Sequence, residues 1–291
     1  MKPLPKYPIY VISKGRHDCC LTANFLLKDK VPFKIVIEPQ EKDLYAAKYG
    51  EDQLLVLPFK NLGKGSIPAR NWVWDHSKEA GAERHWILDD NQRRTRRFYK
   101  GKKVPCDSSI AFRAAEDFTD RYENIAISGL NYDMFAYPQN PPFYLNVHVY
   151  SCLLIDNSLE QRWRGRYNED TDLCLQVLAA GLCTVLINAF TIEKMVTLSM
   201  KGGNMGDLYK GDGRLQMARS LERMWPHVVK TDRRWQRPQH VIKDQWRKFT
   251  TPLIRKKDID FNKFDKVNEY GMKLKQVKPV KSKLLKDMLH K

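Results

Sequence analysis

The chain has 291 residues, 42% of them hydrophobic and 29% charged, which excludes a wholly disordered chain and predicts one large domain or two small ones. No run approaches the roughly 18 apolar residues of a membrane span, and the N-terminus lacks an apolar signal segment, so we expect a cytoplasmic protein. The net charge of +17 indicates a polyanionic partner: nucleic acid, an anionic membrane surface or a nucleotide.

Strands and helices alternate over the first 60 residues. Apolar, β-rich runs predict strands at Tyr7–Ile12, Phe33–Ile37 and Gln53–Leu57. Apolar residues at helical spacing predict helices between them at Cys20–Lys30 and Leu44–Tyr49. This β-α-β-α-β order predicts a parallel sheet with right-handed crossovers.

The fourth strand ends at a group of polar residues. A helix at Ala69–Ala80 precedes the apolar run Trp86–Leu88, which stops at Asp89, Asp90 and Asn91. Ligand sites in α/β sheets lie at the carboxyl ends of strands, and carboxylate and carbonyl oxygens suit Mg²⁺ or Mn²⁺. An Asp/Asn turn explains the triplet on its own, but its place in the α/β order favours a metal and nucleotide-diphosphate site.

The rest of the chain is expected to complete this domain and to end in a basic extension. We assign no strand to the basic run Arg93–Arg97 and expect a loop from there to Cys106. Val241–Lys291 holds fifteen Lys or Arg against six Asp or Glu, so we expect a domain over residues 1–240 and a basic C-terminal extension over 241–291. The other expected elements are helices at Ser109–Tyr122, Asn168–Ala180 and Leu215–Met224, strands at Ile125–Ser128, Leu145–Ile155 and Thr184–Ile187, and an irregular loop at Tyr132–Phe143.

Five motifs follow one another between Tyr7 and Gly206. They are IYVISKGR (9–16), IVIEPQE (35–41), IPARNWVWDH (67–76), WILDDNQ (86–92) and YNEDTDLCLQVLAAG (167–181). Their order resembles GT-A glycosyltransferases, and more closely the TET/JBP-associated glycosyltransferases of bacteriophages, which attach sugars to the hydroxymethyl group of modified pyrimidines in DNA. The resemblance implies an α/β fold with a GT-A-like nucleotide-binding half, a mixed central sheet and an acceptor half, and a location in the host cytoplasm for a viral protein.

The resemblance implies a metal site at the end of the fourth strand. Asp89, Asp90 and Asn91 would hold Mn²⁺ or Mg²⁺ against the diphosphate of a UDP-sugar, where the cation stabilises the leaving group. Asp89 and Asn91 would form the Asp-x-Asp-like pair. Asn91 departs from the family's acid, and because a neutral amide is a weaker ligand, metal dependence is open.

The turn after the first strand is a candidate for donor binding. Ser13, Lys14 and Arg16 surround a glycine, and the resemblance implies that they lie near the base and diphosphate of the donor. The backbone N–H groups of such a turn and a guanidinium can bind phosphate. An ordinary βα turn with a solvated arginine explains the segment equally well.

Three further places complete the implied donor site. Glu38, at the end of the second strand, would accept hydrogen bonds from uracil or ribose, or it faces solvent. Arg70, at the start of a helix, would bind the nucleotide. Lys201 and Gly202, in a second glycine-rich loop, either close over the diphosphate or form a simple flexible loop.

Two acidic residues at a helix start are the candidate catalytic groups. Inverting sugar transfer needs a carboxylate to take the proton of the acceptor hydroxyl, and the resemblance favours Asp170 for this role, with Glu169 second. Capping of the helix by Asn168 and acidic first-turn residues explains the segment without any catalysis. Retaining transfer would need no such base, so the stereochemistry is open.

Clusters of arginine indicate DNA as the polyanion. An enzyme that modifies a base inside a duplex is expected to extrude that base. The proposed DNA contacts are Arg93, Arg94, Arg96, Arg97, Arg164 and Arg166, with the basic extension.

The leading hypothesis is a metal-assisted glycosyltransferase that moves a sugar from a UDP-sugar to 5-hydroxymethylcytosine in DNA, with no membrane partner. A GT-A enzyme with a glycan or protein acceptor is one alternative, and a catalytically inactive DNA-binding GT-A scaffold, suggested by Asn91, is another. A sugar nucleotidylyltransferase fits less well, because the segment Ser13–Arg16 matches its glycine-rich arginine signature poorly. The sugar, the DNA sequence context and the oligomeric state are not predicted.

Overall fold

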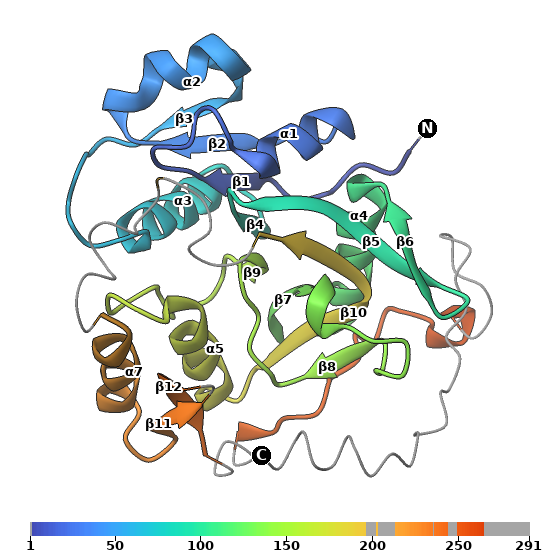
Figure 1. The fold of residues 1–291 in the computed structure, drawn as a ribbon. Helices are drawn as coiled ribbons and strands as arrows, with labels where there is room; N and C mark the ends of the chain where they lie inside the picture. The colour runs from blue at the N-terminus through green and yellow to red at the C-terminus, as the bar shows by residue number, and fades with distance from the viewer. Residues whose placement is uncertain (1, 196–201, 203–212, 235, 244–248, 265–291) are drawn as a thin grey trace.

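The core of the protein is a mixed ten-stranded sheet. A computed structural model describes residues 2–195, 202, 213–234, 236–243 and 249–264. Strands run in the order β3-β2-β1-β4-β9-β7-β10-β5-β6, and β8 pairs with β10 (Figure 1). The first four strands are parallel, whereas β9 is antiparallel to both of its neighbours, β4 and β7.

Helices cover both faces of this sheet because successive side chains of each strand point to opposite faces. In β1, Ile9 and Val11 join the core beneath α1, α2 and α4, and Tyr10 joins the core beneath α3 and α5. The predicted α/β class with a mixed central sheet is therefore confirmed. A small satellite core joins α7 and the β11–β12 hairpin to α5 (Figure 1).

The elements have the following bounds. The helices are α1 (Leu21–Lys28), α2 (Lys42–Tyr49), α3 (Ile67–Glu79), α4 (Ser108–Thr119), α5 (Glu169–Ala179) and α7 (Gly213–Met224), with short 3₁₀ turns η1 (Pro39–Glu41), η2 (Glu51–Gln53), η3 (Asp133–Phe135) and η5 (Phe261–Phe264). The strands are β1 (Ile9–Ile12), β2 (Lys34–Ile37), β3 (Leu54–Val56), β4 (Arg84–Asp89), β5 (Gln92–Tyr99), β6 (Lys102–Cys106), β7 (Ile125–Tyr132), β8 (Phe143–Leu145), β9 (Cys152–Asp156), β10 (Cys183–Lys194), β11 (Val229–Arg234) and β12 (Arg237–Ile242).

The prediction of a loop between the basic run and Cys106 is wrong. This segment forms the β5–β6 hairpin, and β5 also pairs with β10. The segment carries too few apolar residues to give a strand pattern, so its extended form comes from pairing with neighbouring strands. Only Gln92 and Thr95 are buried in it, and most of the basic side chains face outward.

The prediction of one long strand at Leu145–Ile155 is also wrong, because two separate strands, β8 and β9, lie there. Asn146 and Ser151 have φ angles of 56° and 57°, in the left-handed region, and these bends separate β8 from β9. Conversely, β10 runs past the expected end at Ile187 to Lys194. Both differences place polar residues beside Asp89: Ser151 O accepts from Asp89 N at 2.9 Å, and Lys194 Nζ lies 3.0 Å from Asp89 Oδ2.

None of the helices in the described ranges combines the length and the apolar character that a bilayer crossing requires.

Candidate active site

Arg70 joins the two acidic segments that the sequence singles out. It lies in the first turns of α3, and its side chain is only 4% exposed. Its Nη2 lies 2.9 Å from Asp89 Oδ1 at the end of β4, and its Nη1 lies 3.3 Å from Asp170 Oδ1 in the first turn of α5. The guanidinium also stacks on the Trp163 ring, 4.6 Å from its centroid. One buried cation therefore brings the predicted donor and acceptor residues into a single cluster.

Asp170, the predicted base, is buried beside Arg70, and its pKa is raised. Burial raises the pKa of Asp170 to about 7, against the opposing attraction of Arg70. Its second oxygen accepts a hydrogen bond from Ser151 N at 3.1 Å. Glu169, the second candidate, accepts from Ser66 Oγ at 3.1 Å and lies 4.0 Å from Arg70 Nε. Both acids therefore belong to the cluster, but Asp170 is the one in direct contact with Arg70.

Lys194, which the sequence analysis missed, completes this cluster. Its Nζ lies 3.0 Å from Asp89 Oδ2, 2.6 Å from Ser151 Oγ and 3.3 Å from Tyr132 Oη. Burial opposes ionisation of Asp89, yet Lys194 and Arg70 together lower its pKa to about 2. The signal for Lys194 was the run Ala189–Ile192 before it, which extends the strand predicted to end at Ile187 and places a polar residue near its end.

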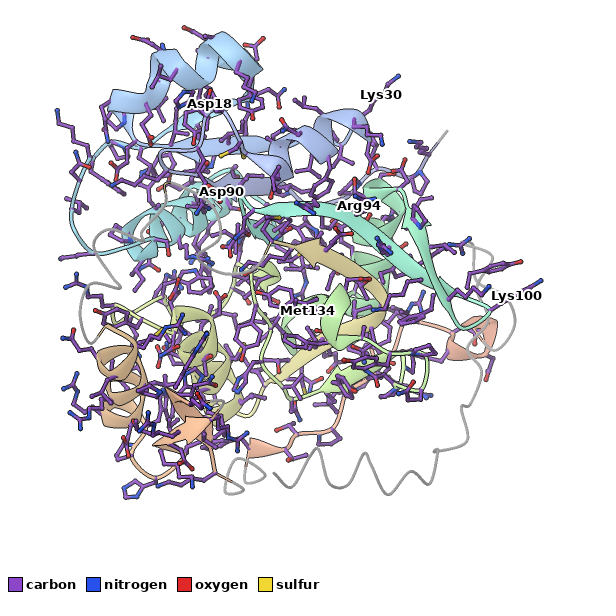
Figure 2. The ribbon with its side chains drawn as sticks, viewed as in Figure 1. Asp18, Lys30, Asp90, Arg94, Lys100 and Met134 are labelled. Carbon is purple, nitrogen blue, oxygen red and sulfur yellow. The ribbon has the colours of Figure 1, made fainter. Side chains whose placement is uncertain are left out.

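Asp90 belongs to a separate network on the other side of β4. It accepts from Ser13 Oγ at 2.8 Å and forms an ion pair with Arg16, and Figure 2 shows where Asp90 lies beneath the first helices. Ser13 in turn is 2.6 Å from Tyr45 Oη. Burial raises the pKa of Asp90, although Arg16 and Ser13 oppose the change. Ser13 and Arg16, both predicted to bind the donor, therefore contact the carboxylate of Asp90 in this structure.

The triplet as arranged does not fit a divalent cation. Both oxygens of Asp89 contact protein cations, and both oxygens of Asp90 contact Arg16 or Ser13. Asn91 contributes one buried amide oxygen without a hydrogen-bond partner, which alone is far from the six oxygen ligands of Mg²⁺. Within the described ranges, no three His, Cys, Asp or Glu side chains are grouped so that they could hold a metal ion.

A hollow at the ends of β1 and β2 brings together the residues predicted to bind the nucleoside. Lys14 Nζ lies 2.9 Å from Glu38 Oε1, and Asn61 N donates to Glu38 Oε2 at 3.1 Å. Burial alone would raise the pKa of Glu38, but these contacts lower it below the ordinary value. The hollow has a volume of about 80 Å³. Its walls are Lys14, Glu38, Phe59, Asn61, Leu62, Gly63, Gly65, Pro68 and Ala69.

The second glycine-rich loop approaches the first one closely. A Cβ on Gly202 would lie 2.3 Å from Gly15 O, and its φ of +80° also favours glycine. Arg16 Nη2 donates to Gly202 O at 3.3 Å. Gly202 therefore lies over the turn predicted to bind the donor. Lys201 lies outside the described residues.

The arginines predicted to bind DNA lie on two different elements. Arg93, Arg94 and Arg96 on β5 each pair with Glu193 of β10, and Arg97 lies over the Tyr99 ring. Arg164 and Arg166 belong to the loop before α5. Arg164 binds Asp172, and Arg166 lies 5.7 Å from the centroid of the Tyr167 ring.

Comparison with known proteins decides the family. The sequence model of the TET-associated glycosyltransferases matches residues 7–203. The chain belongs to this family. The predicted glycosyltransferase activity is thereby confirmed, and the matched region contains Asp89, Arg70, Asp170 and Lys194.

Comparison with solved structures finds only low similarity. A protein of Desulfovibrio desulfuricans G20 assigned as a nucleotide-diphospho-sugar transferase shares 11% identity with this TET-associated glycosyltransferase, at a TM-score of 0.36. The match covers 63% of this chain and 80% of that one. The sequence matches none of the curated proteins.

Proposed function

We propose that the protein transfers a sugar from a UDP-sugar to the hydroxymethyl group of 5-hydroxymethylcytosine in DNA. Family membership supports sugar transfer, and the net charge of +17 supports a polyanionic acceptor. The position of Arg70 between Asp89 and Asp170 carries the proposal, because it supports a donor site and an acceptor base within one cluster.

Asp170 acts as the base in this proposal. The acceptor oxygen attacks the anomeric carbon, its proton passes to Asp170, and the bond between that carbon and the diphosphate oxygen breaks. A base with a pKa of about 7 suits proton transfer at neutral pH. Direct attack of this kind inverts the anomeric carbon.

Protein cations stabilise the departing diphosphate. Arg70 and Lys194 both contact Asp89, so two positive charges adjoin the proposed phosphate position. Fixed charges in a buried site stabilise developing negative charge strongly, because they need no reorganisation during the reaction. Asp89 stays ionised beside them and accepts hydrogen bonds from donor hydroxyl groups.

The predicted Mn²⁺ or Mg²⁺ at Asp89, Asp90 and Asn91 stays a prediction and has no step in this mechanism. The contacts of the two aspartates support charge stabilisation by protein groups instead. The hollow between Lys14 and Glu38 supports a place for uracil and ribose, since a carboxylate can accept from both.

Mass spectrometry of DNA tests the proposed function. Duplexes that differ only in carrying cytosine, 5-methylcytosine or 5-hydroxymethylcytosine are incubated with a panel of UDP-sugars, with EDTA and separately with Mn²⁺. We expect one added sugar per 5-hydroxymethylcytosine and none on the other two duplexes. DNA binding without any transfer would favour an inactive scaffold. Donor turnover with a glycan or protein but no DNA would favour the other acceptor class.

A further inference from the structure

A strongly basic hairpin lies at one edge of the sheet. The β5–β6 segment, residues 92–106, holds seven Lys or Arg and no Asp or Glu. Its acidic neighbours in the described residues include Glu193, which pairs with three of the arginines, and Asp133, which lies 3.6 Å from Lys103 Nζ. The Arg94 side chain remains 53% exposed despite its ion pair. The hairpin therefore keeps an excess of positive charge at the surface.

Large apolar side chains are exposed beside this hairpin. Met134, Phe135 and Tyr137 are 53%, 57% and 50% exposed, and they fall within four residues of sequence in and after η3. Single exposed apolar residues are common, but such a group indicates an interaction site. Lys103 of the hairpin lies 5.8 Å from the centroid of the Tyr137 ring. The hairpin and these three residues together form what we call the hairpin–turn surface.

Figure 2 shows the arrangement of this surface. Arg94 and Lys100 lie along the hairpin, and Met134 lies on the short turn in front of the central strands. The charged and apolar parts thus adjoin each other, so one extended partner can contact both.

Tyr132 connects this surface to the proposed active site. Its ring lies 6.0 Å from the Phe135 ring, measured between centroids. Its hydroxyl is 2.6 Å from Ser151 Oγ and 3.3 Å from Lys194 Nζ. Tyr132 therefore contacts both the exposed Phe135 and Lys194 of the cation cluster.

We propose that the hairpin–turn surface binds duplex DNA, with Met134 and Phe135 inserted between base pairs where the target base leaves the stack. This inference rests on the proposed function. Basic side chains bind phosphates, and apolar side chains such as Phe and Met act as wedges that unstack base steps. A protein partner would not need seven cations, and a free nucleotide would not need a wedge. The extruded base then passes Tyr132 toward Asp170.

A double variant tests the wedge. Met134→Ala with Phe135→Ala removes it, and Leu44→Ala, which is 52% exposed on α2, is the matched control. Each protein is assayed on one 5-hydroxymethylcytosine sequence as a matched duplex, as a duplex with a mismatch at the target, and as a single strand. Base extrusion costs the most energy in the matched duplex, less at a mismatch and least in the single strand.

We expect the double variant to lose at least about tenfold in kcat/KM on the matched duplex and less than about twofold on the single strand, with partial recovery on the mismatch. A 2-aminopurine beside the target should brighten with the wild type and not with the variant. Equal losses on all three DNAs, or no loss on the duplex, would overturn the wedge. No transfer by the wild type to any DNA would overturn the proposed function, and the wedge with it.

Discussion

At the scale of single residues, the site is built around one arginine that serves two acids with opposite needs. Asp89 is kept ionised, with a pKa of about 2, by Arg70 and Lys194. Asp170, which shares the same guanidinium, has its pKa raised to about 7 by burial. Two carboxyl groups with separated pKa values in one site are a common sign of separate roles. Asp89 is suited to binding and Asp170 to proton transfer.

Replacing Asp170 tests this division. Activity needs the ionised carboxylate, so kcat/KM should rise with pH and level off above a midpoint of about 7. Asp170→Asn should lower kcat by about 10²–10⁴-fold, the usual contribution of a general base, and leave donor binding nearly unchanged. Steady-state rates between pH 5.5 and 9 measure both effects.

The same variant provides its own folding control. A carboxyl whose pKa is raised by folding favours the native state only when protonated, so its contribution is complete below about pH 4 and is lost as pH passes 7. Asp170→Asn stays neutral and should melt no lower than the wild type at pH 8. A wild-type rate that is flat across pH 7 would exclude Asp170 as the base.

Replacement of Lys194 tests whether protein cations stabilise the diphosphate leaving group. Lys194→Met should lower kcat/KM by about 10²–10³-fold, a loss typical for removal of one group that stabilises developing charge. EDTA should leave the wild-type rate within about twofold. Lys42→Met is the matched control, because this lysine at the start of α2 also forms an ion pair, with Glu51, and its side chain is 45% exposed. Abolition of wild-type activity by EDTA with restoration by Mn²⁺ would instead support the metal site predicted from the sequence.

At the scale of elements, the sequence predicts apolar strands well. It predicts poorly those strands that are polar and are extended only because they pair with neighbours. β1, β2, β3 and β4 are buried or partly buried runs, so their composition alone marked them. β5 is a run of arginines that is extended because β10 and β6 pair with it, and pairing partners cannot be read from a local pattern. Ser151 lies in the site because its backbone bends in the left-handed region, which serine does not favour, so its position could not be predicted from its residue type.

The hairpin itself can be tested through the salt dependence of DNA binding. Arg94→Ala with Lys100→Ala should make the slope of the log DNA-binding constant against log salt less steep by about two. Each lost phosphate contact contributes about 0.9 to this slope. Turnover at saturating DNA should stay the same. Fluorescence anisotropy between 50 and 300 mM salt measures the slope.

The opposite edge of the sheet supplies the control for the hairpin. Lys42→Ala with Lys48→Ala removes two charges from α2, which contacts β3, whereas β6 ends the strand order at the other side. This pair should leave the slope unchanged. Equal slopes for both double variants would place DNA away from the hairpin.

At the scale of the whole molecule, the positive charge exceeds what a nucleotide site needs. The predicted boundary at residue 240 falls inside β12, and part of the predicted extension packs on the domain. Ile254 O accepts from Glu123 N at 2.9 Å, and Thr251 O accepts from Asn146 Nδ2 at 2.8 Å. Thr251 and Ile254 therefore contact the domain, and the boundary at residue 240 stays a prediction.

A truncation after residue 264 separates these packed residues from the rest of the extension. Residues 265–291 hold eight Lys against three Asp or Glu, so their removal should weaken DNA binding and reduce the salt slope by several units, if most of these lysines contact phosphate. The rate on saturating short oligonucleotides should not change, because the proposed catalytic cluster lies within residues 66–194.

A full-length variant with the eight lysines changed to glutamine should reproduce the truncation, because charge and not chain length supplies the affinity. If the truncation weakens binding and the glutamine variant does not, shape or apolar contacts of the segment are responsible. An unchanged slope in both proteins would assign the polyanion contact to the hairpin and the folded domain alone.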